Sequence, residues 1–138
     1  MKKITTFSLL LLLAAPSFAN GPAQTANSFE TFWQAFKAAV TKRDVPAVAR
    51  MSKFPIEMSY GIPTVKTKAQ LTRRYRRVFN EQTDAAACFG KAKPEADAED
   101  PKHFSIACPD AAGNEVVVYH FQQTRSGWKF TGLDNLNE

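Results

Sequence analysis

The side chains best suited to acid–base chemistry in this sequence are Tyr119 and His120, which are neighbours in an alternating segment. In an extended strand, adjacent side chains point to opposite faces of the sheet. If Tyr119 points into the protein together with Phe121, then His120 points away from it. Tyr119 is therefore the better candidate to line a pocket, where a tyrosine hydroxyl can donate a hydrogen bond to a developing oxyanion.

Three other aromatic residues are candidates to line the same pocket, namely Trp33, Tyr60 and Trp128. The alternative is that both tyrosines are ordinary core residues, because a buried tyrosine hydroxyl usually reaches a polar partner or water. We predict no catalytic residue, because a catalytic carboxylate needs apolar surroundings that move its pKa toward the working pH. The carboxylates near the predicted strands lie in polar or turn contexts instead: Glu57, Asp110, Glu115 and Asp134.

The sequence lacks the local motifs that hold a phosphate, a metal ion or an activated serine. It has no glycine-rich phosphate loop, no serine in a nucleophile-elbow pattern and no cluster of metal ligands. We therefore predict no cofactor and no metal.

The densest charged feature is an arginine-rich stretch inside a predicted helix. Arg73, Arg76 and Arg77 lie on the face opposite the apolar residues of that helix. This basic face is a candidate surface for an anionic partner. The alternative is a solvated helix face, which is what most charge runs are.

The only two cysteines, Cys88 and Cys108, are predicted to form a disulfide, because an even count in an exported chain favours a bridge. Two free thiols, or half of a metal site, are the competing interpretations.

The N-terminus predicts export to the periplasm. Lys2 and Lys3 precede an apolar run from Leu9 to Ala15, and Ala19 ends a short segment typical of a cleavage site. The apolar run is shorter than the roughly 20 residues that cross a bilayer, so we expect a cleaved signal over residues 1–19 and not a membrane anchor.

Residues 20–26 read as a flexible leader, and residues 27–138 as a single domain. The formal net charge is +5, and two of the lysines that contribute to it belong to the expected signal. Export and this mild charge argue against nucleic acid as a partner.

Periodicity predicts an α+β fold with helices packed on one face of an antiparallel sheet. A first helix should start at Asn27 and carry large aromatics on one face, and Asp44 should cap a second. A strand over 56–60 and a helix from Thr67 to about Asn80 follow. Strands are then expected over 87–91, 103–108, 115–123 and 128–133, with a loop over 92–102. The predicted inward residues are Val117, Tyr119, Phe121, Trp128 and Phe130.

Several of these segments give the chain a resemblance to the nuclear-transport-factor-2-like superfamily, and within it to small exported bacterial proteins that have no assigned function. The segments are Phe32–Phe36 with Asp44, the strand entry Lys53–Ile56, the helix Leu71–Phe79, and Ser126–Gly132. The resemblance implies a cystatin-like cone, in which a curved sheet wraps around the long N-terminal helix. Its members include isomerases, dehydratases, ligand binders and interaction domains, so the fold alone selects no function.

Two functional hypotheses follow. The first is an exported, non-catalytic binding or interaction module, whose partner is a small apolar ligand, an anionic protein or an anionic envelope component. The second is a small-molecule isomerase, dehydratase or hydrolase that uses the interior of the cone. We also expect a homodimer, because Val116 and Val118 form an apolar pair on the outer side of the sheet.

Overall fold

The computed structural model of the 138-residue chain describes residues 22–59, 61–114 and 116–136, and for residues 22–27 the backbone alone. The expected signal and Tyr60 lie outside these residues. The chain forms helices α1 (Pro22–Thr41) and α2 (Val45–Arg50), strand β1 (Ser52–Met58), helix α3 (Lys68–Arg76) with a π-helical turn η1 (Arg77–Glu81), helix α4 (Ala85–Phe89), and strands β2 (Glu95–Ala96), β3 (His103–Pro109), β4 (Val116–Thr124) and β5 (Gly127–Asn135).

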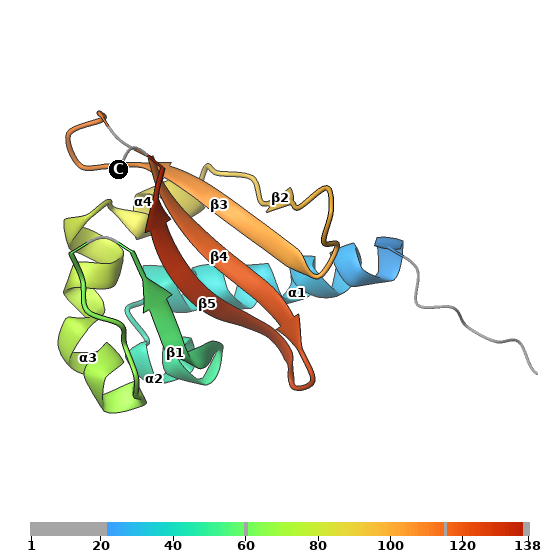
Figure 1. Ribbon diagram of the computed structural model, residues 1–138, viewed down its shortest axis with the longest axis horizontal. Coiled ribbons are helices and arrows are strands. Elements are labelled where there is room, and N and C mark those ends of the chain that lie inside the picture. The colour runs from blue at the N-terminus through green and yellow to red at the C-terminus, as the bar shows by residue number, and fades with distance from the viewer. Residues whose placement is uncertain (1–21, 60, 115, 137–138) are drawn as a thin grey trace, which may run out of the picture.

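The strands form one five-stranded sheet in the order β1-β5-β4-β3-β2, and the helices lie on one of its faces (Figure 1). The predicted α+β architecture is confirmed, but the sheet is mixed and not fully antiparallel. β1 pairs with β5 in parallel, with Ser52 opposite Phe130 and Met58 opposite Leu133. The long connection between β1 and β5, which contains helices and three further strands, allows this pairing, which a short hairpin would not.

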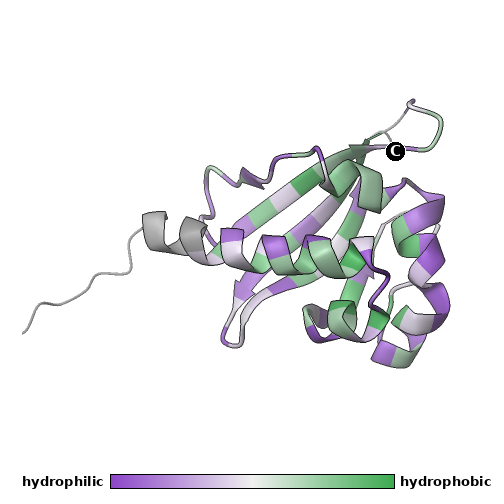
Figure 2. Cartoon of the chain, turned by 180° about the vertical axis from the view of Figure 1, so that it is seen from behind, coloured by the Kyte–Doolittle hydropathy of each residue, from purple (hydrophilic) through white to green (hydrophobic). Residues whose placement is uncertain are grey.

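The core forms where α1 crosses the concave side of the sheet. Figure 2, seen from the helical side, shows α1 lying over the hydrophobic residues of the strands. Phe36 is fully buried, and its ring meets that of Phe121 edge-on at 5.2 Å between centroids. All five predicted inward residues of β4 and β5 are buried, as expected. Val118, predicted as part of an exposed apolar pair on the outer side of the sheet, is also only 5% exposed, so that expectation is wrong for Val118.

Two buried tyrosines tie the helices to their neighbours through main-chain acceptors. Tyr75 of α3 donates its hydroxyl to the Val40 carbonyl of α1 at 3.3 Å. Tyr119 of β4 donates to the Val78 carbonyl in η1 at 2.8 Å. Each hydroxyl therefore has a partner inside the protein, as buried polar groups require.

Two local predictions are wrong. Helix α1 begins at Pro22 and not at Asn27, so the expected leader is helical from residue 22 onward. Proline is favoured at the first helical position because its missing N–H would have no helical partner there. The expected strand over 87–91 is instead helix α4, whose N-cap Asp84 accepts a hydrogen bond from the Ala87 amide at 3.1 Å. Consecutive alanines favour a helix more strongly than the apolar pattern favours a strand.

Two strand limits also differ from the sequence prediction. β1 starts at Ser52, four residues before the expected Ile56, and includes Pro55. It is an edge strand, where a proline is tolerated because no neighbour needs its N–H. The expected loop over 92–102 contains the two-residue strand β2.

The predicted disulfide is confirmed. Cys88 of α4 and Cys108 of β3 are bonded, with their Cα atoms 5.8 Å apart. The bridge fastens α4 to the face of the sheet, and Cys108 itself is fully buried. No free cysteine remains.

Removal of this bridge should destabilise the protein. For a sequence separation of 20 between the cysteines, chain entropy predicts that the paired substitution Cys88→Ser and Cys108→Ser lowers the free energy of unfolding by about 3 kcal/mol. Urea denaturation of the variant and of wild type, each with and without dithiothreitol, measures this. Dithiothreitol should destabilise wild type alone, and an unchanged midpoint in the variant would contradict the prediction.

Truncation of Phe36 should also be costly. Phe36→Ala leaves a cavity between α1 and the sheet and should lower the free energy of unfolding by about 3–5 kcal/mol. Gln34→Ala, at an exposed position of the same helix, is the matched control and should change stability by less than about 0.5 kcal/mol. Equal midpoints for the two variants in urea would show that α1 does not pack on the sheet in this way.

Candidate functional site

The predicted interior pocket residues lie in the packed core. Trp33, Tyr119 and Trp128 are 2%, 0% and 4% exposed. Burial raises the pKa of the Tyr119 hydroxyl well above its ordinary value, and Tyr75 and Asp84 act in the same direction. Because the Tyr119 hydroxyl donates its hydrogen bond to the Val78 carbonyl, it has no second proton with which to bond a ligand. Of these candidates, Tyr60 alone lies outside the described residues.

One polar atom of the core lacks a partner. The indole Nε1 of Trp128 is buried without a hydrogen bond to any described residue. The ring is held edge-on by Phe29 at 4.9 Å and by Phe104 at 5.4 Å between centroids. Trp128 is thus packed as a hydrophobic residue despite its donor.

The predicted arginine face is partly neutralised. Arg76 and Arg77 both pair with Glu81, at 3.4 Å and 3.8 Å between nitrogen and oxygen. The neighbouring Arg74 donates to the carbonyls of residues 63 and 64 and so braces the loop before α3. Of the three predicted partner-binding residues, Arg73 alone has no carboxylate partner among the described residues.

A stronger concentration of positive charge lies elsewhere, around a hollow of about 370 Å³ that we call the basic hollow. Five of its lining residues are cationic, and no lining residue is acidic. None of the five forms an ion pair with a carboxylate in the part of the chain that the structure describes. The lining residues are Ala49, Arg50, Ser52, Lys53, Lys68, Thr124, Arg125, Ser126 and Lys129.

Main-chain and side-chain hydrogen bonds hold the walls of the basic hollow together. The Phe130 amide donates to the Met51 carbonyl at 2.9 Å, which joins β5 to the end of α2. The Lys129 ammonium donates to the Arg50 carbonyl at 2.7 Å, where the negative end of the α2 dipole favours a cation. On the opposite wall, Thr124 donates to the Gly127 carbonyl at 2.7 Å and shapes the turn between β4 and β5.

Sequence reasoning missed the basic hollow because its cations come from distant parts of the chain. Arg50 and Lys53 flank the start of β1, Lys68 begins α3, and Arg125 and Lys129 belong to the last hairpin. No local run of charge marks them. The parallel pairing of β1 with β5, which the sequence did not predict, is what brings the first and last groups together.

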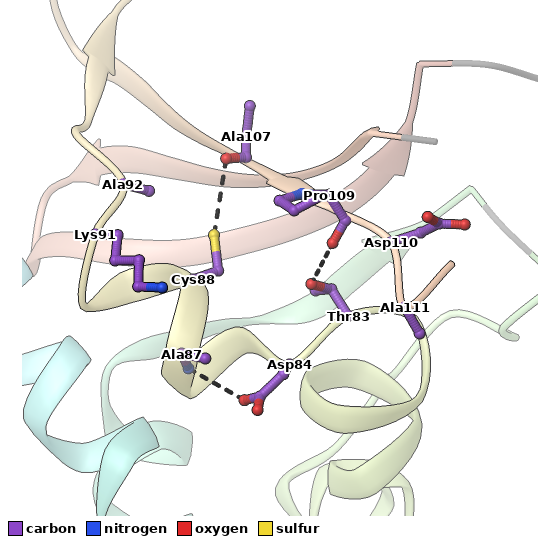
Figure 3. A pocket seen from close by; sticks show the side chains of 10 residues that line it. All are labelled: Thr83, Asp84, Ala87, Cys88, Lys91, Ala92, Ala107, Pro109, Asp110 and Ala111. Atoms are coloured by element: carbon purple, nitrogen blue, oxygen red, sulfur yellow. Dashed lines mark hydrogen bonds between the residues drawn. The ribbon is translucent and has the colours of Figure 1, made fainter. Parts of the chain in front are cut away.

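A second hollow, of about 480 Å³, lies beside the disulfide (Figure 3). Its lining is rich in alanine, and two of its polar side chains already have partners within the protein. Thr83 donates to the Pro109 carbonyl at 2.5 Å, and Asp84 caps α4. These contacts fasten the loops around the bridge, so we assign this hollow a structural role.

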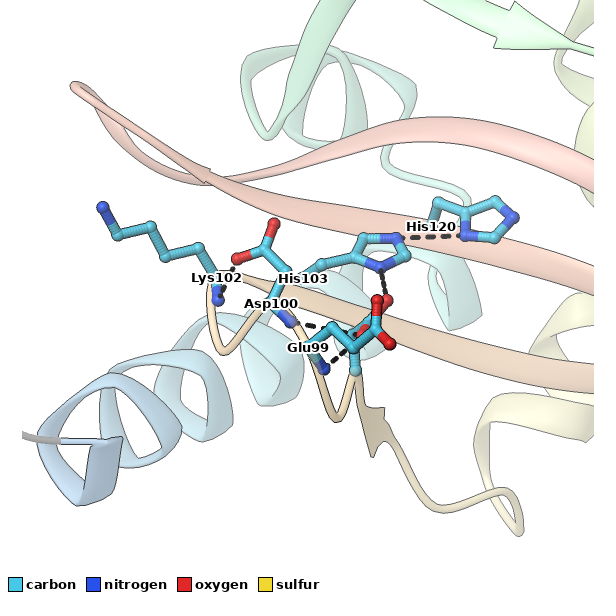
Figure 4. Close-up of polar contacts among 6 residues, drawn as sticks. Glu99, Asp100, Lys102, His103 and His120 are labelled. Carbon is cyan, nitrogen blue, oxygen red and sulfur yellow. Dashed lines mark hydrogen bonds and ion pairs between the residues drawn. The ribbon is translucent and has the colours of Figure 1, made fainter.

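A chain of titratable groups crosses the outer face of the sheet (Figure 4). Asp97 Oδ2 lies 3.4 Å from His103 Nδ1, and His103 Nε2 lies 3.2 Å from His120 Nδ1. Hydrogen bonds from the Glu99 and Asp100 amides, followed by the His103 ring, lower the pKa of Asp97. Asp97 is therefore an ionised carboxylate, so it accepts the hydrogen bond from His103 and sets the direction in which the hydrogen bonds of this series run.

The outward position of His120 agrees with the strand alternation read from the sequence. The ring is half-buried, and this desolvation is the main cause of its lowered pKa; His103 lowers the pKa further, and Asp134 opposes the shift. His120 also lines a hollow of about 290 Å³ on the outer face, which we call the outer groove. The lining residues are Glu57, Met58, Ser59, His120, Gly132, Leu133 and Asp134.

Within residues 22–59, 61–114 and 116–136, no three histidine, cysteine, aspartate or glutamate side chains come together as a metal site. In the same ranges, none of the helices has the length and hydrophobicity needed to cross a membrane.

Comparison with solved structures finds proteins of similar fold at low sequence identity. One is an NTF2-like protein with a cystatin-like fold from Novosphingobium aromaticivorans, with 13% identity and a TM-score of 0.47 over 83% of this chain and 84% of that chain. Another is hexachlorocyclohexane dehydrochlorinase LinA-type3 from Novosphingobium barchaimii LL02, with 13% identity and a TM-score of 0.49 over 82% and 86%. A third is a domain of unknown function with a cystatin-like fold from Nostoc punctiforme, with 11% identity and a TM-score of 0.47 over 83% and 78%.

These three proteins share 11–13% sequence identity with this chain, and the comparison concerns the fold alone. No protein-family model matches the chain, and no curated protein matches it.

The lowered pKa of His120 predicts that stability depends on pH. Below the ordinary histidine pKa of about 6.5, the unfolded chain takes up a proton at this position more readily than the folded protein does. The free energy of unfolding should therefore fall as the pH drops from that value through the pKa of folded His120. His120→Gln should reduce this fall, as measured by urea denaturation between neutral and mildly acidic pH. An NMR titration that placed the pKa of His120 above its ordinary value would contradict the prediction.

Proposed function

We propose that this protein is an exported, non-catalytic binding module that takes an anionic partner at the basic hollow. The observation that carries this proposal is the gathering of five cationic side chains around one hollow with no carboxylate in its lining. Unlike the arginine face, which shares its charge with Glu81, the basic hollow has no internal counter-ion in the described residues.

The charge balance of the whole chain supports this proposal. Without Lys2 and Lys3 of the expected signal, the chain has 16 basic and 13 acidic residues, so the five cations of the hollow exceed the formal excess of +3. The rest of the exported chain would then carry 11 basic and 13 acidic residues. A concentrated charge of this kind raises the local concentration of anions and accelerates their association.

The side chains of the basic hollow favour a ligand with several anionic oxygens. Arg50 and Arg125 carry planar guanidinium groups that bind phosphate or carboxylate in a bidentate manner, whereas the lysines act as point charges. Three hydroxyl-bearing residues, Ser52, Thr124 and Ser126, complete the polar lining. Suitable partners are therefore an acidic protein segment or a phosphorylated or sulfated component of the cell envelope.

Export is part of this proposal and rests on the signal-like sequence of residues 1–19. The disulfide is compatible with an oxidising compartment, where such bridges persist. In that location a polyanion of the envelope is a more accessible partner than nucleic acid.

The alternative is a small-molecule enzyme that works inside the cone. Among the described residues, no side chain is placed to catalyse a reaction there. Trp33, Tyr119 and Trp128, the described residues predicted to line its pocket, are packed in the core, and the Tyr119 hydroxyl is bonded to the main chain. The geometry therefore favours surface binding over chemistry in the interior.

Two triple variants that remove equal charge should separate the basic hollow from the arginine face. Lys53→Gln, Lys68→Gln and Arg125→Gln together should weaken binding to a sulfated polysaccharide about tenfold or more, equivalent to roughly 1.4 kcal/mol. Arg73→Gln, Arg76→Gln and Arg77→Gln together should weaken it less than about threefold, because ion pairs on an exposed surface contribute little. Titration calorimetry at two salt concentrations measures both.

Each outcome of this comparison decides between two sites. If the arginine triple variant loses more affinity than the hollow triple variant, the partner binds at α3 and the proposal is wrong. If both lose the same affinity, the protein responds only to its net charge and has no anion site.

A further inference from the structure

The outer groove presents several hydrogen-bond acceptors, and the Ser59 hydroxyl in its lining already donates to Asp134. No described residue donates a hydrogen bond or forms an ion pair with the Glu57 carboxylate, which lines the groove. Asp134 uses its Oδ1 to accept from the Ser59 hydroxyl and from the Asn135 amide. Its Oδ2 has no donor in the described part of the chain. No lysine or arginine is among the lining residues of this groove.

The third acceptor is a ring nitrogen of His120, and the neighbouring groups decide its protonation. Because Asp97 is a carboxylate, the His103 nitrogen that faces it, Nδ1, carries the proton. His103 Nε2 is then an acceptor, so His120 Nδ1 must carry the proton that lies between the two rings. In neutral His120 the remaining nitrogen, Nε2, holds a lone pair.

This lone pair is available to a ligand. His120 Nε2 has no hydrogen-bond partner among the described residues, and it is not one of their buried unsatisfied atoms. The outer groove therefore combines two carboxylates with one neutral imidazole acceptor. The two carboxylates alone would attract any cation, whereas the imidazole lone pair selects a cation that also donates a hydrogen bond.

We propose that the outer groove is a binding site for a primary ammonium group, with His120 Nε2, Glu57 and Asp134 as its three acceptors. A primary ammonium has three N–H donors and one positive charge. It matches both the number of acceptors and the negative charge of the groove. This site is separate from the basic hollow and does not depend on the function proposed for that hollow.

The proposal predicts a specific coupling to pH. The charged or titratable groups that face His120 are His103 on β3, Asp134 on β5 and Glu57 on β1, with Asp97 acting through His103. Protonation of His120 would remove the acceptor and place a positive charge beside the ammonium. A bound ammonium therefore lowers the pKa of His120, and its affinity falls as His120 becomes protonated.

The test compares two cations that differ in their donors. Butylammonium carries three N–H donors, and tetramethylammonium carries the same charge with none. Addition of butylammonium to the full mature protein should shift the His120 Nε2 resonance in nitrogen NMR spectra of the imidazole and should lower the pKa of His120. Tetramethylammonium should do neither at the same concentration and ionic strength.

Variants locate the site. His120→Phe should abolish saturable binding of butylammonium, followed through the amide resonances of residues 57–59 and 132–134. Glu57→Gln should weaken binding about two- to fivefold, as expected for an exposed ion pair. Glu99→Gln removes the same charge from the neighbouring turn outside the groove and should leave binding unchanged.

The outcomes either support or overturn the site. Equal effects of the two cations, or equal weakening by Glu57→Gln and Glu99→Gln, would reduce the effect to general electrostatics and overturn the proposal. Absence of a saturable shift with butylammonium would overturn it as well. If the site is present, tighter binding of Nα-acetyl-lysine amide than of putrescine assigns the ammonium to a protein side chain, and the reverse order assigns it to a free polyamine.

Discussion

The packing of one aromatic helix face against the concave side of the sheet is the interaction on which the rest of this structure depends. Phe36 and Trp33 of α1 meet Phe121 of β4 at ring distances of 5.2 and 5.7 Å. These contacts remove large apolar surfaces from water and fix the position of α1, which the hydrogen bond from the Tyr75 hydroxyl to the Val40 carbonyl reinforces. The rings of Trp33, Phe36 and Phe121 therefore form part of the core between α1 and the sheet.

That surface is divided by charge in a way that follows from strand order. β1 lies beside β5, so the cations near residue 50 meet those of the last hairpin at the end of the sheet. The other end of the same β1–β5 pair contributes Glu57 and Asp134 to the outer face, next to His120. A single parallel strand pair therefore contributes side chains to a positive hollow and to a hollow rich in acceptors. The two would recognise ligands of opposite charge.

Much of the fold could be read from local patterns, because those patterns report burial directly. The aromatic face of α1, the Asp44 and Thr67 caps and the inward positions of Tyr119 and Phe121 all appear in the structure. Helix α4 was misread because a short apolar segment is compatible with either period. The basic hollow could not be found at all, since its residues converge only through a pairing that links positions near 52 and 130. The contact between His103 and His120 could not be predicted either, because the register between β3 and β4 decides which of their side chains lie next to each other.

Each edge of the sheet has a feature that limits pairing with further strands. On one side, β1 contains Pro55, and Ile56 is bridged to Val65. On the other, β2 is only two residues long, with Glu95 and Ala96 exposed. An open edge would act as a template for extended segments of other chains and so promote aggregation. Pro55 and the shortness of β2 therefore limit edge-to-edge pairing between copies of this chain.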